Sequence, residues 1–143
     1  MASQRELADR FYQAIASGDK MEALEVCSAD LDFWAPGYMG GRGVDAAWTY
    51  NEPFVSAFPD AKVTITNQVE SGNTVVSEIT YTGTHTGPLP SPQGPVPPTG
   101  KRIDLPGCGI ARIEAGKIVS FRGYFDQLTL MQQLGLMPEP AAP

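Results

Sequence analysis

The sequence contains little cysteine and little histidine. Among its 143 residues there are two cysteines, Cys27 and Cys108, and one histidine, His85. The cysteines stand far apart and have no Cys or His neighbour at metal-ligand spacing, so we expect buried thiols rather than a disulfide. A zinc site is excluded by the same spacing, and the carboxylates suggest no other metal site.

Basic clusters and long apolar runs are also absent. Ten Lys and Arg against sixteen Asp and Glu give a formal net charge of −6, and no basic run could follow a nucleic-acid backbone. No apolar stretch approaches the roughly 20 residues of a membrane helix, and the polar N-terminus lacks the apolar stretch of a signal peptide. We therefore expect no nucleic-acid partner, no membrane association and a cytoplasmic location.

What is present is the composition of an ordinary globular domain. Hydrophobic residues make up 42% of the chain and charged residues 18%. A chain of this length can bury about two-thirds of its unfolded surface in one core. We predict a single domain over residues 1–137, followed by a flexible tail over residues 138–143.

Helical periodicity dominates the first part of the chain. A capping-box pattern, in which Ser or Asp is followed three residues later by Glu, begins at Ser3 and again at Asp19. Pro53 interrupts a later helical pattern and is expected to kink or divide that helix. The predicted elements are a helix over 3–17, a shorter helix after residue 19, a strand over 31–35 and a helix over 44–58.

From residue 61 onward the pattern alternates. Val63, Ile65 and Val69 are expected on one side of a strand that ends near residues 71–73. Six prolines between residues 88 and 98 exclude a regular strand and predict a stiff loop over 88–102 that could cover a cavity. The other predicted elements are strands over 74–86, 103–113 and 117–125 and a helix after residue 126.

This order of elements indicates an α+β fold. Helices on one face of a mostly antiparallel sheet are the usual arrangement when helices and strands are segregated along a chain. We predict a cone-shaped, curved sheet wrapped round the N-terminal helices and enclosing a pocket. Such a pocket is a natural site for a small molecule.

Five short motifs then occur in order: AFPD at 57–60, GTHTG at 83–87, PTGKR at 98–102, GKIV at 116–119, and YFDQ at 124–127 running into QLG at 133–135. Together they resemble the SnoaL-like polyketide cyclase and ester cyclase family of the nuclear-transport-factor-2-like superfamily, over about residues 5–137. The resemblance implies a homodimer formed through the sheet and an intramolecular aldol condensation without metal or coenzyme. By position in the motifs, Asp126 would be the catalytic base and His85 would assist it.

Asp126 has two interpretations from the residues themselves. As a general base it must be desolvated, so that its pKa rises toward the working pH. As a structural carboxylate it would cap the helix that begins at Gln127. If Asp126 continues the preceding strand, its face is shared by Ser120, Arg122 and Tyr124, and the other face by Val119, Phe121 and Phe125.

The remaining candidates are a histidine, an arginine and several aromatic residues. His85 has the strand parity of Ser77, Ile79 and Tyr81, and would either stabilise an enolate and relay a proton or be hydrogen-bonded within its own turn. Arg122, which stands where relatives often have Trp, is either a surface charge or a partner of Asp126 or of a substrate oxygen. The candidate substrate-binding residues are Arg122, Tyr124, Tyr81, Trp34 and Trp48.

Three functions remain open at this point. The first is an acid/base enzyme that cyclises or isomerises a small, oxygenated, mainly apolar compound. The second is epoxide opening by Arg122 and Asp126, which needs a second carboxylate from Asp32, Asp45 or Asp60. The third is a noncatalytic, dimeric module that binds a small molecule.

Overall fold

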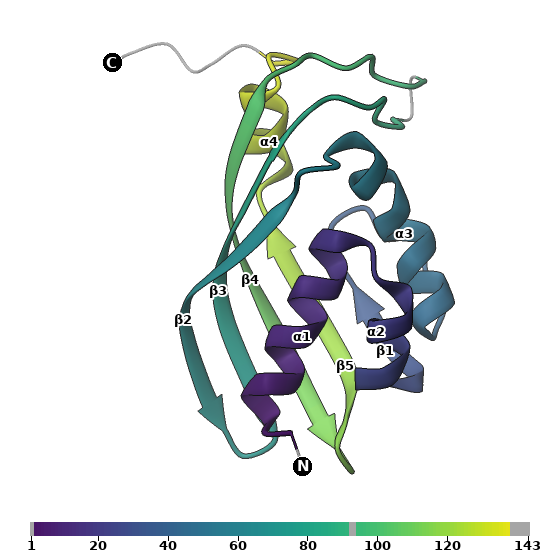
Figure 1. Cartoon of the computed structure of the whole chain (residues 1–143), viewed down its shortest axis with the longest axis vertical. Coiled ribbons are helices and arrows are strands. Elements are labelled where there is room, and N and C mark those ends of the chain that lie inside the picture. Colours follow the sequence, from purple (N-terminus) through teal and green to yellow (C-terminus); the bar gives the residue numbers. More distant parts are fainter. Residues whose placement is uncertain (1, 92–93, 138–143) are drawn as a thin grey trace.

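The computed structural model describes residues 2–91 and 94–137 of the chain (Figure 1). The predicted tail over residues 138–143 lies outside the described residues. The elements in chain order are α1 (Gln4–Ser17), α2 (Lys20–Val26), β1 (Cys27–Trp34), α3 (Val44–Ala57), β2 (Lys62–Ser71), β3 (Thr74–Thr84), β4 (Arg102–Glu114), β5 (Lys117–Phe125) and α4 (Gln127–Gln133).

Within the described residues, five strands form one sheet in the order β1-β5-β4-β3-β2. The pairs β2–β3, β3–β4 and β4–β5 are antiparallel, and β1 joins β5 in parallel. In Figure 1 the sheet bends around α1, and α2 and α3 lie on the same side of the sheet as α1. This arrangement confirms the predicted α+β fold with a mostly antiparallel sheet.

Local sequence accounts for the ends of the first helices. Ser3 Oγ accepts a hydrogen bond from the Glu6 amide at 3.1 Å, and Asp19 Oδ1 accepts one from the Glu22 amide at 3.1 Å, as N-capping side chains do. Pro53 was expected to kink or divide its helix. It does not divide the helix, because α3 runs unbroken from Val44 to Ala57.

The prediction for Val69 is wrong. A register shift in the β2–β3 pairing lies between Ile65 and Asn67, and one extra residue reverses the faces that follow it. Val63 is therefore buried, whereas Val69 is 55% exposed. Gln68 takes the partly buried position and donates hydrogen bonds to Asp9 and Ser77.

The buried apolar residues form two clusters. The larger one lies between the helices and the sheet and includes Phe11, Leu31 and Ile118. The second combines residues of α3, β4, α4 and the proline-rich loop, and consists of Ala57, Phe58, Leu89, Ile103, Leu105, Leu130 and Leu134. Among the described residues, no helix combines the length and the apolarity that crossing a bilayer requires.

Candidate functional site

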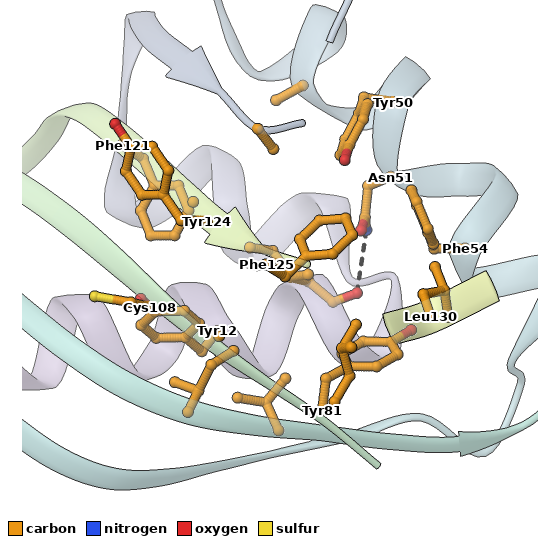
Figure 2. Close-up of a pocket in the computed structure, with 18 of the residues that line it drawn as sticks. Tyr12, Tyr50, Asn51, Phe54, Tyr81, Cys108, Phe121, Tyr124, Phe125 and Leu130 are labelled. Carbon is orange, nitrogen blue, oxygen red and sulfur yellow. Dashed lines mark hydrogen bonds between the residues drawn. The ribbon is translucent and has the colours of Figure 1, made fainter. Parts of the chain in front are cut away.

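A cavity of about 120 Å³ lies between the inner face of the sheet and helices α1 and α3 (Figure 2). Residues of α1, α3, α4 and all five strands surround the cavity, and β2 contributes Val63. Within the described part of the chain, no Asp, Glu, Lys, Arg or His is among the residues that line it. The polar members of the lining are Tyr12, Tyr50, Asn51, Tyr81, Cys108 and Tyr124.

Two of these polar side chains are held by backbone carbonyls. Asn51 Nδ2 donates to the Ile15 carbonyl at 3.1 Å, which ties α3 to α1 (dashed line in Figure 2). The Tyr50 hydroxyl donates to the Pro36 carbonyl at 2.8 Å. The rest of the lining is apolar or aromatic, so a neutral molecule could enter without stranding a charge in a region of low polarity.

Burial favours the protonated form of three of the phenols that line the cavity. It raises the pKa of Tyr12, Tyr50 and Tyr81 above the usual value, and for Tyr12 the neighbouring Ser77 opposes this shift. The Tyr12 hydroxyl is buried and, among the described residues, has no hydrogen-bond partner of normal geometry. The hydroxyl protons of Tyr12 and Tyr81 are available for an oxygen of a bound molecule, whereas Tyr50 already donates its proton to the Pro36 carbonyl.

Gly109 makes room for the Tyr12 side chain. A Cβ atom at Gly109 would lie 1.8 Å from the Tyr12 hydroxyl and 2.9 Å from the Phe121 ring. No other residue fits at this position unless Tyr12 moves. The position of Tyr12 in the cavity lining therefore depends on the absence of a side chain at Gly109 in β4.

The structure places Asp126 at the surface, as the N-cap of α4. Its Oδ1 accepts hydrogen bonds from the amides of Leu128 at 2.9 Å and Thr129 at 3.4 Å, and its Oδ2 accepts one from the Thr129 hydroxyl at 2.9 Å. These hydrogen bonds, above all those from Thr129, lower the pKa of Asp126. The capping interpretation is correct, and the predicted desolvation of this carboxylate is wrong because the strand ends at Phe125 and the side chain turns back onto the helix that follows.

Asp126 nevertheless stands next to the cavity along the chain. Phe125, directly before it, and Leu130, one turn into α4, both line the cavity. His85 is not among the lining residues, and within the described residues no hydrogen bond or ion pair joins it to Asp126. The two predicted catalytic side chains are therefore not brought together.

In β5 the side chains from Ser120 to Phe125 alternate as predicted, but a register shift breaks the count at Val119, so that Ile118 and Phe121 are both buried. Phe121 is buried under the helices, where its ring packs against Phe11 at 4.8 Å and Tyr12 at 5.5 Å. Arg122 and Tyr124 consequently point to the outer face of the sheet. The aromatic side chain wins the inner face because its burial stabilises the fold, whereas burying an unpaired guanidinium would be costly.

Arg122 pairs with Asp32 instead of Asp126. The two groups meet through Nη2–Oδ2 at 2.7 Å and Nη1–Oδ1 at 3.2 Å, in a shallow hollow that also contains Trp34. Trp34 is 38% exposed and its ring lies 5.3 Å from the ring of Tyr124, which is 47% exposed. Two of the predicted substrate-binding residues, Arg122 and Trp34, thus lie outside the cavity, whereas Tyr124 packs beside Trp34 and is also part of the cavity lining.

Tyr81 and Trp48 line the cavity, as a substrate-binding role requires. Tyr12 and Asn51 were missed by sequence reasoning. Asn51 lies one helical turn after the buried Trp48 and is itself 7% exposed, so a polar residue on the apolar face of α3 was the available signal. Among the described residues, no three His, Cys, Asp or Glu side chains gather as metal ligands would.

His85 is completely buried at the end of β3. Its Nδ1 accepts a hydrogen bond from the Thr99 amide at 3.2 Å and lies 3.0 Å from the Thr99 hydroxyl. Its ring lies 5.4 Å from the ring of Phe58, which lines the cavity. His85 therefore sits behind the cavity wall.

Comparison with known proteins gives a consistent result. The family model for SnoaL-like polyketide cyclases matches residues 6–134. A proposed SnoaL-like polyketide cyclase from Jannaschia sp. CCS1 is 22% identical, with a TM-score of 0.82 over 94% of this chain and 93% of that one. IdmH, a proposed polyketide cyclase from Streptomyces antibioticus, is 25% identical, with a TM-score of 0.80 over 94% and 99%.

A third similar structure is AclR, a proposed hydroxylase from Streptomyces galilaeus. It is 23% identical, with a TM-score of 0.78 over 95% of this chain and 87% of that one. No curated protein matches the chain significantly. The solved structures therefore support the fold, and the family model supports the predicted family.

Proposed function

Because the chain belongs to the SnoaL-like polyketide cyclase family, we propose that it is a cofactor-independent acid/base enzyme that cyclises or isomerises a small, oxygenated, mainly apolar compound. One observation carries this proposal. The cavity combines an apolar and aromatic wall with protonated phenols and an amide, and the described residues that line it include no charged side chain. This lining suits a neutral ketone or ester.

The proposed cyclisation is an aldol reaction. A base removes a proton from a carbon next to a carbonyl, the enolate carbon forms a bond to a second carbonyl carbon, and the resulting alkoxide takes up a proton. In an isomerisation the proton returns to a different carbon. Tyr12 and Tyr81 would donate hydrogen bonds to the enolate oxygen, where a site of low polarity makes each donor more effective than in water.

Asp126 is the proposed proton acceptor, acting on the part of the substrate that reaches the α4 end of the cavity. Its lowered pKa keeps it ionised at neutral pH, although an ionised carboxylate with a lowered pKa is a weaker base than a desolvated one. To accept the proton, the carboxylate has to release at least one of its capping hydrogen bonds. The role of Asp126 therefore depends on a local movement that experiment can test.

The test is hydrogen–deuterium exchange at the carbons next to the carbonyl of cyclohexanone in D₂O, followed by NMR. An apolar cavity of about 150 Å³ can bind benzene, so a single neutral ring is a suitable probe. Asp126→Asn keeps a good N-cap but removes the base, and we expect it to lower the exchange rate at least about 100-fold with an unchanged Tm.

The matched control is Asp19→Asn, which changes the N-cap of α2 in the same way. We expect exchange at the wild-type rate in this variant. If Asp126→Asn also exchanges at the wild-type rate, Asp126 is only a helix cap. Saturable binding of cyclohexanone to the wild-type protein without any exchange would favour the noncatalytic binding module.

Epoxide opening has no specific observation in its favour, because Arg122 is engaged by Asp32 on the outer face of the sheet. We also propose the homodimer that the family resemblance implies. Trp34 and Tyr124 expose aromatic surface on that outer face, which a second copy could cover. Sedimentation equilibrium of the protein would give the mass of a monomer if this is wrong.

A further inference from the structure

The loop that follows β3 has a built structure in its described parts, residues 86–91 and 94–101, which we call the proline-rich cover. Leu89 and Val96 exchange two backbone hydrogen bonds, at 3.0 Å and 2.7 Å. Leu89 is 5% exposed and packs in the second cluster with Phe58 and Leu130. Since Phe58 and Leu130 also line the cavity, the cover packs on the back of the cavity wall.

The cover is attached to the body of the protein at both ends of the loop. The amides of Thr86 and Gly87 donate to the Ala57 carbonyl at 3.0 Å and 3.2 Å. Gly87 approaches α3 so closely that a Cβ atom there would lie 2.1 Å from the Ser56 carbonyl oxygen. On the other side, the His85 amide donates to the Lys101 carbonyl at 2.9 Å, and the Gly100 amide donates to the His85 carbonyl at 2.8 Å.

The imidazole of His85 completes this attachment, and its contacts determine which ring nitrogen carries the proton. A backbone amide can only donate, so Nδ1, which faces the Thr99 amide, must be the unprotonated acceptor. The neutral ring then carries its hydrogen on Nε2. Nε2 is buried and has no hydrogen-bond partner among the described residues.

This arrangement does not suit proton transfer with a substrate. The basic nitrogen, Nδ1, is occupied by Thr99, and the ring is separated from the cavity by Phe58, which lies against it and forms part of the wall. We propose that His85 is a positioning residue that latches the proline-rich cover through Nδ1 and Thr99, and acts on a bound substrate only through the wall at Phe58. This proposal rests on the proposed function in one respect, which is that the cavity is taken as the substrate site.

Two substitutions separate the two ring nitrogens. His85→Asn places an amide oxygen near the position of Nδ1 and removes the Nε2 position. His85→Gln extends toward the Nε2 position and loses the acceptor at Nδ1. A latch therefore requires the acceptor that Asn keeps, whereas proton transfer requires a titratable ring nitrogen, which neither Asn nor Gln supplies.

The first measurement is amide hydrogen exchange by NMR at Leu89, Val96 and Gly100, on the protein without ligand. Loss of a buried hydrogen bond should lower protection at least about 10-fold in His85→Gln, and His85→Asn should stay within about 3-fold of wild type. Thr99→Val, which keeps the amide but removes the hydroxyl, should fall between the two. Wild-type protection in His85→Gln would overturn the latch.

The second measurement is cyclohexanone exchange kinetics. If His85 is a latch, His85→Gln should raise KM for cyclohexanone and leave kcat within about 3-fold of wild type. His85→Asn should keep the wild-type KM. If His85→Asn instead loses kcat about 100-fold while cover protection stays normal, His85 is catalytic and the inference is wrong. The protection measurement needs no turnover, so a protein that catalyses no exchange at all refutes the proposed function and leaves the latch to be decided by protection.

Discussion

Gly109→Ala is the sharpest test of how the cavity is built. The added Cβ would stand 1.8 Å from the Tyr12 hydroxyl, and a contact of 3.0 Å requires Tyr12 to move by at least 1.2 Å, the difference between the two distances. Tyr12 is 3% exposed and packs edge-on against Phe121, so it cannot turn into solvent. Overpacking of this kind costs about 1–3 kcal/mol. For a chain of this size we expect Tm to fall by about 3–12 °C.

A double-mutant cycle with Tyr12→Phe identifies the cause. Removing the hydroxyl eliminates the 1.8 Å contact and leaves the ring carbon at 2.9 Å, so Gly109→Ala should cost less in the Tyr12→Phe background. Tyr12→Phe alone should change stability little, because the hydroxyl has no hydrogen-bond partner of normal geometry among the described residues. We expect a coupling of about 1 kcal/mol between the two sites.

The assay is thermal and urea unfolding of the four proteins, with Gly123→Ala as the matched control. Gly123 pairs with Gly109 across β4 and β5, but a Cβ atom there meets its nearest atom, on Phe121, at 3.3 Å. This variant should lose much less stability. Additive effects in the cycle, or equal losses for the two glycine substitutions, would refute the packing argument.

Two further predictions concern charge and ionisation. Arg122→Gln should leave KM for cyclohexanone unchanged and lower the free energy of unfolding by less than about 1 kcal/mol. The reason is that the ion pair of Arg122 with Asp32 is about one-third exposed and lies outside the cavity. A tenfold rise in KM would show that Arg122 contributes to substrate binding after all. The phenols of Tyr12, Tyr50 and Tyr81 have raised pKa values in the fold, so the stability they contribute is present below the unfolded value of about 10 and is lost as pH rises above it. Ultraviolet absorbance should show that these three phenols ionise only when the protein unfolds. Ionisation of all three near pH 10 in the folded protein would contradict their buried arrangement.

The helix caps and the order of elements could be predicted because they depend on residues a few positions apart. Ser3 and Asp19 cap their helices whatever the rest of the chain does. The reversal of faces in β2 could not be predicted, because a bulge is an irregularity of strand pairing and the alternating pattern of Val63, Ile65 and Val69 carries no sign of it.

The candidate site was predicted in part. Tyr81 and Trp48 were expected to line a pocket and do so. For Asp126, both roles follow from the same residue at the same position, between a strand and a helix, and local sequence favours neither. The side chain caps α4 because the amides at the helix start are within its reach. Among the described residues, the cavity lining includes no Lys, Arg or His that could pair with the carboxylate instead.

The sequence by itself determined the fold class, the two N-capped helices, the family and the alternation of side chains from Ser120 to Phe125 in β5, since each depends on a local pattern or on an ordered set of motifs. Only the tertiary structure decided which face of β5 meets the helices, and with it the outward position of Arg122. It also decided that His85 bonds to Thr99 and lies behind Phe58. The physical reason is that burial and hydrogen-bond pairing are settled between segments far apart in the chain, and no periodicity within one segment contains that information.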